Sequence, residues 1–229
     1  NLSVQRTEAR SDGRTVEQAV FPGLWATAAH NVDWWLELHL LSQLRATPGG
    51  PLLAQRYLAS GLVFTPATWF PLLDAQLSIG RLADAQDERL RPGVRWTSKA
   101  TLRPLARLEL EPSWSSSWLR GEGGRVYDER LVNLLAVWHL GPRSHLRAIV
   151  QRTGLDRGGD GVPAGALQRA RNVSLTWSWR LSAGTVVYVG ASDARSGVGA
   201  TTRTREAFVK LQADLDDTRS AWAARGPGS

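Results

Sequence analysis

The sequence of 229 residues contains neither cysteine nor methionine. The lack of cysteine excludes disulfide frameworks and thiolate metal sites. No run of about 18 apolar residues occurs, which excludes an apolar membrane-spanning helix. Because Asn1 stands where an initiator methionine would, we expect the chain to start inside a longer precursor, with any signal peptide outside this sequence.

Histidine is also scarce, with four in the whole chain. No catalytic signature surrounds any serine, so we predict that the protein is not an enzyme, with an envelope hydrolase as the alternative. His139 and His145 flank the turn at Gly141-Pro142, and a tight hairpin places them opposite one another. Two imidazoles without a third ligand make a poor metal site, so we predict no metal and no cofactor.

The chain has fewer acidic than basic residues: 21 Asp and Glu against 28 Lys and Arg, which gives a net charge of +7. Nucleic acid is the first partner to consider for such a chain. The arginines are spread singly, however, and no base-stacking motif accompanies them, so we predict no nucleic-acid partner. A basic surface also suits anionic lipid headgroups or lipopolysaccharide.

Alternation of apolar and polar residues is the strongest pattern present. In the segment 169–181, Val173, Leu175, Trp177 and Trp179 alternate with polar residues. A period of two is typical of a strand with one apolar and one polar face. The same pattern predicts about twelve strands, near 2–10, 14–26, 32–45, 56–65, 69–82, 94–103, 105–119, 126–140, 145–155, 169–181, 185–194 and 204–215.

The connections between these strands are expected to alternate strictly in length. Pro and Gly mark tight turns at 65–68, 103–105, 141–144 and 182–184. Longer loops are expected at 46–55, 83–93, 120–125, 154–168 and 195–203. Short turns at one end and long loops at the other are typical of outer-membrane barrels, so we predict a transmembrane antiparallel up-and-down β-barrel.

Both faces of the expected barrel carry candidate functional residues. Unpaired charges in mid-strand would be costly in a sandwich core but suit a wet lumen. The predicted lumen-lining residues are Asp33, Glu37, His39, Lys99, Arg103, Arg107, Glu109, Glu111, Arg147, Arg180, Glu206 and Lys210. The sequence holds 11 Trp, and indole settles at the headgroup level of a bilayer. The predicted membrane-interface aromatics are Trp34, Trp69, Trp96, Trp118, Trp138 and Trp179.

The turn expected at 103–105 fixes the register of one hairpin. It places Thr101 opposite Arg107 and Lys99 opposite Glu109. Cross-strand ion pairs help to set register, so the expected Lys99–Glu109 pair is interpreted first as a structural element of the lumen. The alternative is a selectivity band that lines a pore.

Several segments carry a family resemblance. They are Leu90-Arg91-Pro92-Gly93 and the segments 108–114, 125–131, 146–151, 185–190 and 205–211. Over residues 85–215 the chain resembles the C-terminal barrel region of uncharacterised bacterial outer-membrane proteins that carry an N-terminal family-nine carbohydrate-binding-type module. The resemblance implies an outer-membrane barrel, places sugar binding in the module outside this chain, and implies that the strands form part of a larger barrel.

Together these patterns predict a barrel domain, or the C-terminal portion of one, over residues 1–215 and a polar tail over 216–229. The expected function is a porin-like channel or transport-associated barrel in a Gram-negative outer membrane, with lipid or lipopolysaccharide around it. Other envelope proteins, or the missing N-terminal part of the same protein, are further expected partners. The alternatives are a scaffold barrel for an envelope complex and a soluble β-rich carbohydrate-binding protein. An excess of positive lumen charge favours anionic solutes.

Overall fold

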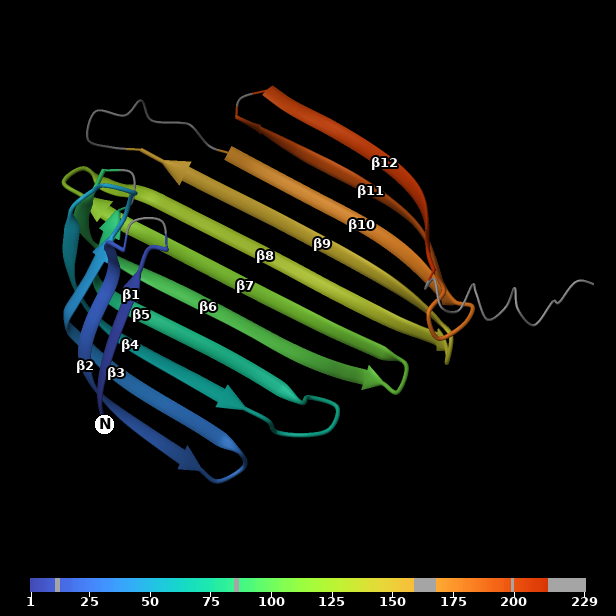
Figure 1. Cartoon of the computed structure of the whole chain (residues 1–229), viewed down its shortest axis with the longest axis horizontal. Coiled ribbons are helices and arrows are strands. Elements are labelled where there is room, and N and C mark those ends of the chain that lie inside the picture. Colours follow the sequence, from blue (N-terminus) through green and yellow to red (C-terminus); the bar gives the residue numbers. More distant parts are fainter. Residues whose placement is uncertain (11–12, 85–86, 159–167, 199, 214–229) are drawn as a thin grey trace, which may run out of the picture.

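The structure, a computed structural model, describes residues 1–10, 13–84, 87–158, 168–198 and 200–213. These form one sheet of twelve antiparallel strands in sequence order, from β1 at one edge to β12 at the other (Figure 1). The strands are β1 Leu2–Glu8, β2 Thr15–Ala28, β3 Val32–Arg45, β4 Leu52–Phe64, β5 Leu72–Asp84, β6 Arg89–Leu105, β7 Leu108–Gly121, β8 Gly124–Gly141, β9 Ser144–Arg157, β10 Gln168–Arg180, β11 Val186–Val198 and β12 Ala200–Gln212.

The all-β prediction of twelve up-and-down strands is therefore confirmed. The alternating pattern located most strands within a few residues, and β3 coincides with the predicted segment 32–45. The predicted tail, 216–229, lies outside the described residues.

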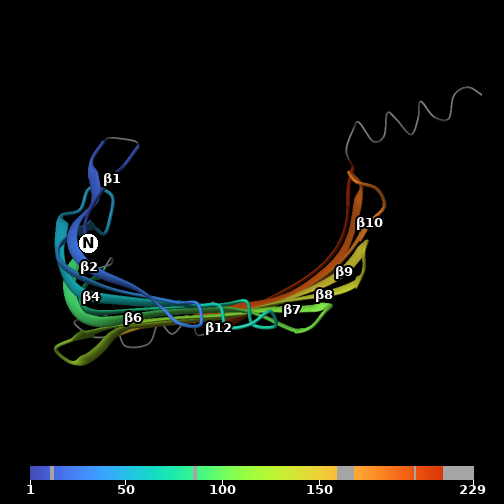
Figure 2. The same ribbon diagram turned by 90° about the horizontal axis from the view of Figure 1, so that it is seen from below.

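The sheet is strongly curved rather than flat. Figure 2 shows an open trough, with β1 and β2 on one wall and β9 and β10 on the other. Within the described residues the sheet order contains no pairing between β1 and β12, so the two edge strands remain unjoined.

Directly paired residues lie on the same side of a sheet, so the register divides the side chains into two sets. Side chains inside a curve converge and bury one another, whereas those outside splay apart. The set with the buried members, among them Phe21, His39, Ala59 and Leu82, is therefore the concave side. The other set is the convex side.

The convex side carries most of the large apolar residues that are exposed. Those that lie on its strands include Trp34, Leu38, Leu58, Ile79, Trp114, Val132, Leu134, Trp138, Val150, Leu175, Trp179, Val189, Val209 and Leu211. Trp25 and Phe208 are exposed on the concave side. The alternation read from the sequence thus separates the faces along nearly the whole sheet.

The predicted strict alternation of short and long connections is wrong. Pairing in β7 and β8 continues to Gly121 and Gly124, which leaves a turn of Glu122 and Gly123 where a longer loop was expected. Pairing in β11 and β12 continues to Val198 and Ala200, with a single residue between them. Glycine permits the tight reversal at Gly124, where φ is +124°, so strands extend into the segments expected to be loops.

The predicted register of the β6–β7 hairpin is also wrong, by four residues. Leu105 pairs with Leu108, so the turn consists of Ala106 and Arg107. Pro104 lies instead inside β6, at the irregularity between Leu102 and Leu105, which is a position where a strand tolerates proline. Because four is an even number, the residues that remain in the two strands keep their predicted side of the sheet, whereas Arg107 leaves the strand for the turn.

Glycine and aromatic residues pack against one another on the concave side. A side chain at Gly80 would collide with the backbone of Tyr57. The Trp35 ring covers Gly61, and the Phe208 ring covers Gly190. These glycines let a large ring lie close to the neighbouring strand.

Candidate functional site

A row of polar residues crosses the concave side at mid-strand. The paired residues run from Asp74 on β5 through Lys99 on β6, Ser113 on β7 and Asn133 on β8 to Gln151 on β9. The row continues to Asn172 on β10. This continuous polar row makes the concave side wettable from β5 to β10.

The predicted lumen residues share this side with one exception. The register places ten of them on the concave side: Asp33, Glu37, His39, Lys99, Glu109, Glu111, Arg147, Arg180, Glu206 and Lys210. Arg103 lies at the irregularity of β6 and reaches the same side through its ion pair with Glu109. Arg107 does not belong to the set, because it lies in the turn between β6 and β7. The turn lies beyond Pro104, at Ala106 and Arg107, and this position removes Arg107 from the strand in which it was predicted.

The ion pairs differ from those expected. Lys99 contacts the carboxylate of Asp74 on β5 at 3.4 Å rather than Glu109. Glu109 accepts a hydrogen bond from Arg103 Nε at 2.8 Å. In the observed register Lys99 faces Ser113, four residues from Glu109 along β7, so the predicted Lys99–Glu109 pair is wrong.

His39 lies in a buried aromatic stack that the sequence did not reveal. Its ring lies between Phe21 and Tyr57, with centroid distances of 4.2 and 4.3 Å. Its Nε2 contacts Glu37 Oε2 at 3.1 Å, while Nδ1 is buried without a hydrogen-bond partner in the described part of the chain. Only the register places Tyr57 opposite His39, so alternation alone could not have found this stack.

A buried charged pair lies further along the same side. Arg91 Nε is 3.2 Å from Asp84 Oδ2, and both side chains are more than 90% buried. Arg91 also contacts Asp87 at 2.6 Å. The sequence predicts a loop over 83–93, and this prediction conceals the cluster; it is wrong at both ends, because β5 and β6 pair as far as Asp84 and Arg89.

Two hollows open on the concave side. The first, of about 300 Å³, is lined by Asp74, Gln76, Lys99 and Ser113 among others. The second, of about 320 Å³, includes Arg95, Tyr127, Glu129 and Arg157. The Tyr127 hydroxyl donates a hydrogen bond to Glu129, and the Arg157 guanidinium lies 4.9 Å from the centre of the Tyr127 ring. Both hollows combine charges of opposite sign.

His139 and His145 pair across the β8–β9 hairpin, as the sequence predicted. Their ring centroids are 6.1 Å apart, and the His145 ring hydrogen-bonds the Ser178 hydroxyl at 2.9 Å. No cluster of three metal-ligating side chains occurs among the residues that the structure describes.

The predicted interface tryptophans lie in two groups. Trp138 and Trp179 are about half-exposed near the ends of β8 and β10, and Trp34 lies near the start of β3. Trp69 is exposed in the β4–β5 connection. At the opposite end Trp118 lies near the end of β7, where Arg120 and Arg125 contact its ring. Trp96 departs from the predicted strand-end position, because it lies in the middle of β6 and its Nε1 is buried.

No protein-family model matches the chain, and no curated protein matches it significantly. Among the described residues, no helix has the length and apolar character needed to cross a membrane. The resemblance to a family of outer-membrane barrels stays a prediction.

Proposed function

We propose that this chain forms the wall of an outer-membrane β-barrel through which a polar solute passes. The observation that carries the proposal is the separation of the two sides: large apolar side chains are exposed over the convex side, and the polar row crosses the concave side. Lipid would cover the convex side, and water would fill the space over the concave side.

Strand length supports a membrane location. A tilted strand crosses a bilayer with about nine to eleven residues. Strands β2 to β12 have between 13 and 18 residues, which is enough, whereas β1 has 7. Exposed apolar patches on soluble monomers rarely exceed a few hundred Å². An apolar convex side that extends from β3 to β12 fits lipid better than water.

The charges of the concave side support a preference for anions. Arg147 on β9 and Arg180 on β10 are exposed and have no carboxylate partner in the described part of the chain. Two carboxylates of the concave side are already paired with cations of their own: Asp74 with Lys99, and Glu109 with Arg103. Unpaired guanidinium groups at the wall of a lumen attract anions.

Conductance across a planar bilayer tests this proposal. We expect the folded protein to conduct, with a reversal potential in a KCl gradient that indicates chloride selectivity. The double variant Arg147→Glu and Arg180→Glu should shift selectivity toward cations, because it changes the sign of the unpaired charges. A matched variant on the convex side, Arg152→Glu and Arg171→Glu, should leave selectivity nearly unchanged. A sealed or cation-selective wild-type pore would contradict the proposal.

A scaffold barrel is the second candidate, and the unjoined edges favour it. The outer edges of β1 and β12 expose backbone groups that lipid cannot satisfy. In a scaffold, an envelope protein or a further part of the same protein would pair with these edges. Absence of conductance together with heat-modifiable migration on a denaturing gel would favour the scaffold. Absence of both would favour a soluble carbohydrate-binding protein.

A further inference from the structure

The convex side changes from apolar to basic at one level along five strands. On β9, Leu146, Ala148 and Val150 are followed by Arg152. On β10 the order is mirrored, with Arg169 and Arg171 before Val173. We define the arginine rim as Arg130, Arg152, Arg169, Arg171, Arg195, Arg203 and Arg205, all on the convex side of β8 to β12.

The register places four of these arginines next to one another. Arg152 pairs with Arg171, Arg171 with Arg195, and Arg195 with Arg203. Neighbouring strands are about 4.8 Å apart, and like charges directly opposite one another destabilise a sheet. This row therefore requires anionic groups to neutralise it.

The protein supplies only part of that negative charge. Asp193 contacts Arg195, Arg203 and Arg205. Asp128 contacts Arg130 at 3.0 Å. Arg152, Arg169 and Arg171 are exposed, and within the described residues no carboxylate lies within ion-pair distance of them. Three guanidinium groups on β9 and β10 are thus available to an external anion.

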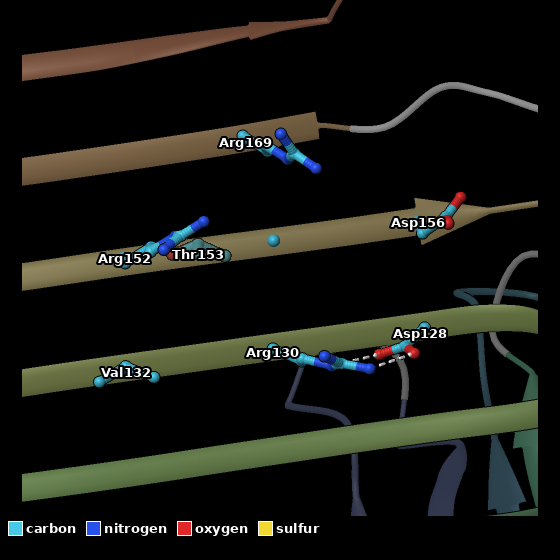
Figure 3. A pocket seen from close by; sticks show the side chains of 8 residues that line it. Asp128, Arg130, Val132, Arg152, Thr153, Asp156 and Arg169 are labelled. Carbon is cyan, nitrogen blue, oxygen red and sulfur yellow. Dashed lines mark hydrogen bonds and ion pairs between the residues drawn. The ribbon is translucent and has the colours of Figure 1, made fainter.

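A hollow of about 460 Å³ lies among these groups (Figure 3). Arg130, Gly154 and Arg169 form one cross-strand row, so the absent side chain of Gly154 leaves space between two arginines. Arg152 lines the same hollow from β9, and Asp128 and Asp156 lie at its other end. The hollow opens on the convex side. Directly beside it lies the apolar band, which we define as the exposed apolar residues on the convex side of β8 to β12, among them Val132, Val150, Leu175, Val189 and Val209.

We propose that the arginine rim binds the phosphate of an anionic lipid headgroup whose acyl chains cover the apolar band on β8 to β12. Guanidinium binds phosphate through two parallel hydrogen bonds. Phosphates of lipids lie just outside the hydrocarbon, and the rim lies just outside the apolar band. The inference rests on the proposed membrane location and adds a ligand class and its binding residues.

Lipid binding to the detergent-solubilised protein, measured by native mass spectrometry, tests the proposal. The probes are a bisphosphorylated glucosamine-disaccharide lipid, its dephosphorylated form and phosphatidylcholine. We expect strong binding of the phosphorylated lipid alone. The variant Arg152→Gln and Arg171→Gln should weaken that binding by about tenfold or more, since each arginine contributes charge-assisted hydrogen bonds. Arg152→Lys with Arg171→Lys should give an intermediate loss.

The matched control is Arg147→Gln with Arg180→Gln. These residues lie on the same two strands, are exposed and lack carboxylate partners, but they belong to the concave side. The control should bind the phosphorylated lipid within about twofold of the wild type. Equal losses in both double variants would show nonspecific attraction and overturn the proposal. Competition by millimolar inorganic phosphate as effective as that by the lipid would also overturn it.

A separate measurement distinguishes failure of this inference from failure of the proposed function. Insertion into neutral phosphatidylcholine vesicles, followed by heat-modifiable migration, reports the membrane location alone. Insertion without lipid selectivity rejects the arginine rim as a lipid site and keeps the barrel. Failure to insert rejects both. Both double variants should insert as the wild type does, which shows that they fold.

Discussion

At the scale of single residues, the concave side depends on glycines that accommodate rings. Gly80 on β5 lies under Tyr57, and Tyr57 in turn packs against His39. A methyl group at Gly80 would overlap the carbonyl of Arg56 and the Cα of Tyr57, and backbone atoms cannot rotate away as a side-chain tip can. Gly80 therefore couples the spacing of β4 and β5 to the aromatic stack.

We expect Gly80→Ala to destabilise the folded protein by about 1–3 kcal/mol, the usual cost of overpacking. Urea unfolding in detergent micelles, followed by tryptophan fluorescence, measures the change. Gly141→Ala is the control, because a Cβ at Gly141 meets no atom within 4 Å. Equal stability of the two variants would show that β4 and β5 separate without cost.

The residues that matter on the two sides were predictable to different degrees. Alternation assigned Glu37, Arg147 and Lys210 to the side they occupy, because side-chain direction follows strictly from position in a strand. The stack of Phe21, His39 and Tyr57 was not predictable, since it joins three strands through their register. The sequence indicates directly which side of the sheet a residue occupies, but it indicates the strand register only through the position of the turns.

At the scale of elements, the β6–β7 hairpin shows this limit. Pro104 suggested a turn, yet β6 continues past it, and Leu105 pairs with Leu108. Proline removes one hydrogen-bond donor, which an irregular point in a strand can tolerate. The segment 195–203 is likewise predicted to be a loop. Its described residues belong instead to β11 and β12, where Gly197 pairs with Thr201.

Engineered disulfides test the β6–β7 register, and the absence of native cysteine makes the result unambiguous. Lys99→Cys with Ser113→Cys should crosslink on oxidation, because directly opposite residues meet the Cα distance of a disulfide. Lys99→Cys with Glu109→Cys should not, since four residues along β7 add about 14 Å. The reverse outcome would restore the register in which Lys99 faces Glu109. Mass spectrometry of peptides identifies the crosslink.

At the scale of the whole molecule, the open trough raises the question of what closes it. β1 has 7 residues and pairs with only the first part of β2, from Thr15 to Pro22. The edge of β2 beyond Gly23 therefore has no neighbouring strand within the described chain. Lipid cannot hydrogen-bond exposed backbone groups, so a membrane-embedded form needs a partner along both edges.

We expect β1 and β12 to pair when the protein is in a bilayer. Gln5→Cys on β1, combined in turn with Glu206→Cys, Phe208→Cys or Lys210→Cys on β12, should give an intramolecular crosslink for one partner. All four positions belong to the concave side. Crosslinked dimers would show that a second copy closes the trough. No crosslink with any partner would indicate that another polypeptide fills the gap.

The alternation that separates the two sides also determines how the chain behaves before it folds. Its mean hydropathy is −0.25, so the extended polypeptide is compatible with water before its strands pair. When the strands pair, the apolar residues at alternate positions gather on one side of the sheet, and only then does the protein have a large apolar face. For the membrane location proposed above, this order would let one sequence remain compatible with water while unfolded and expose its apolar face only on folding, where a bilayer would cover it.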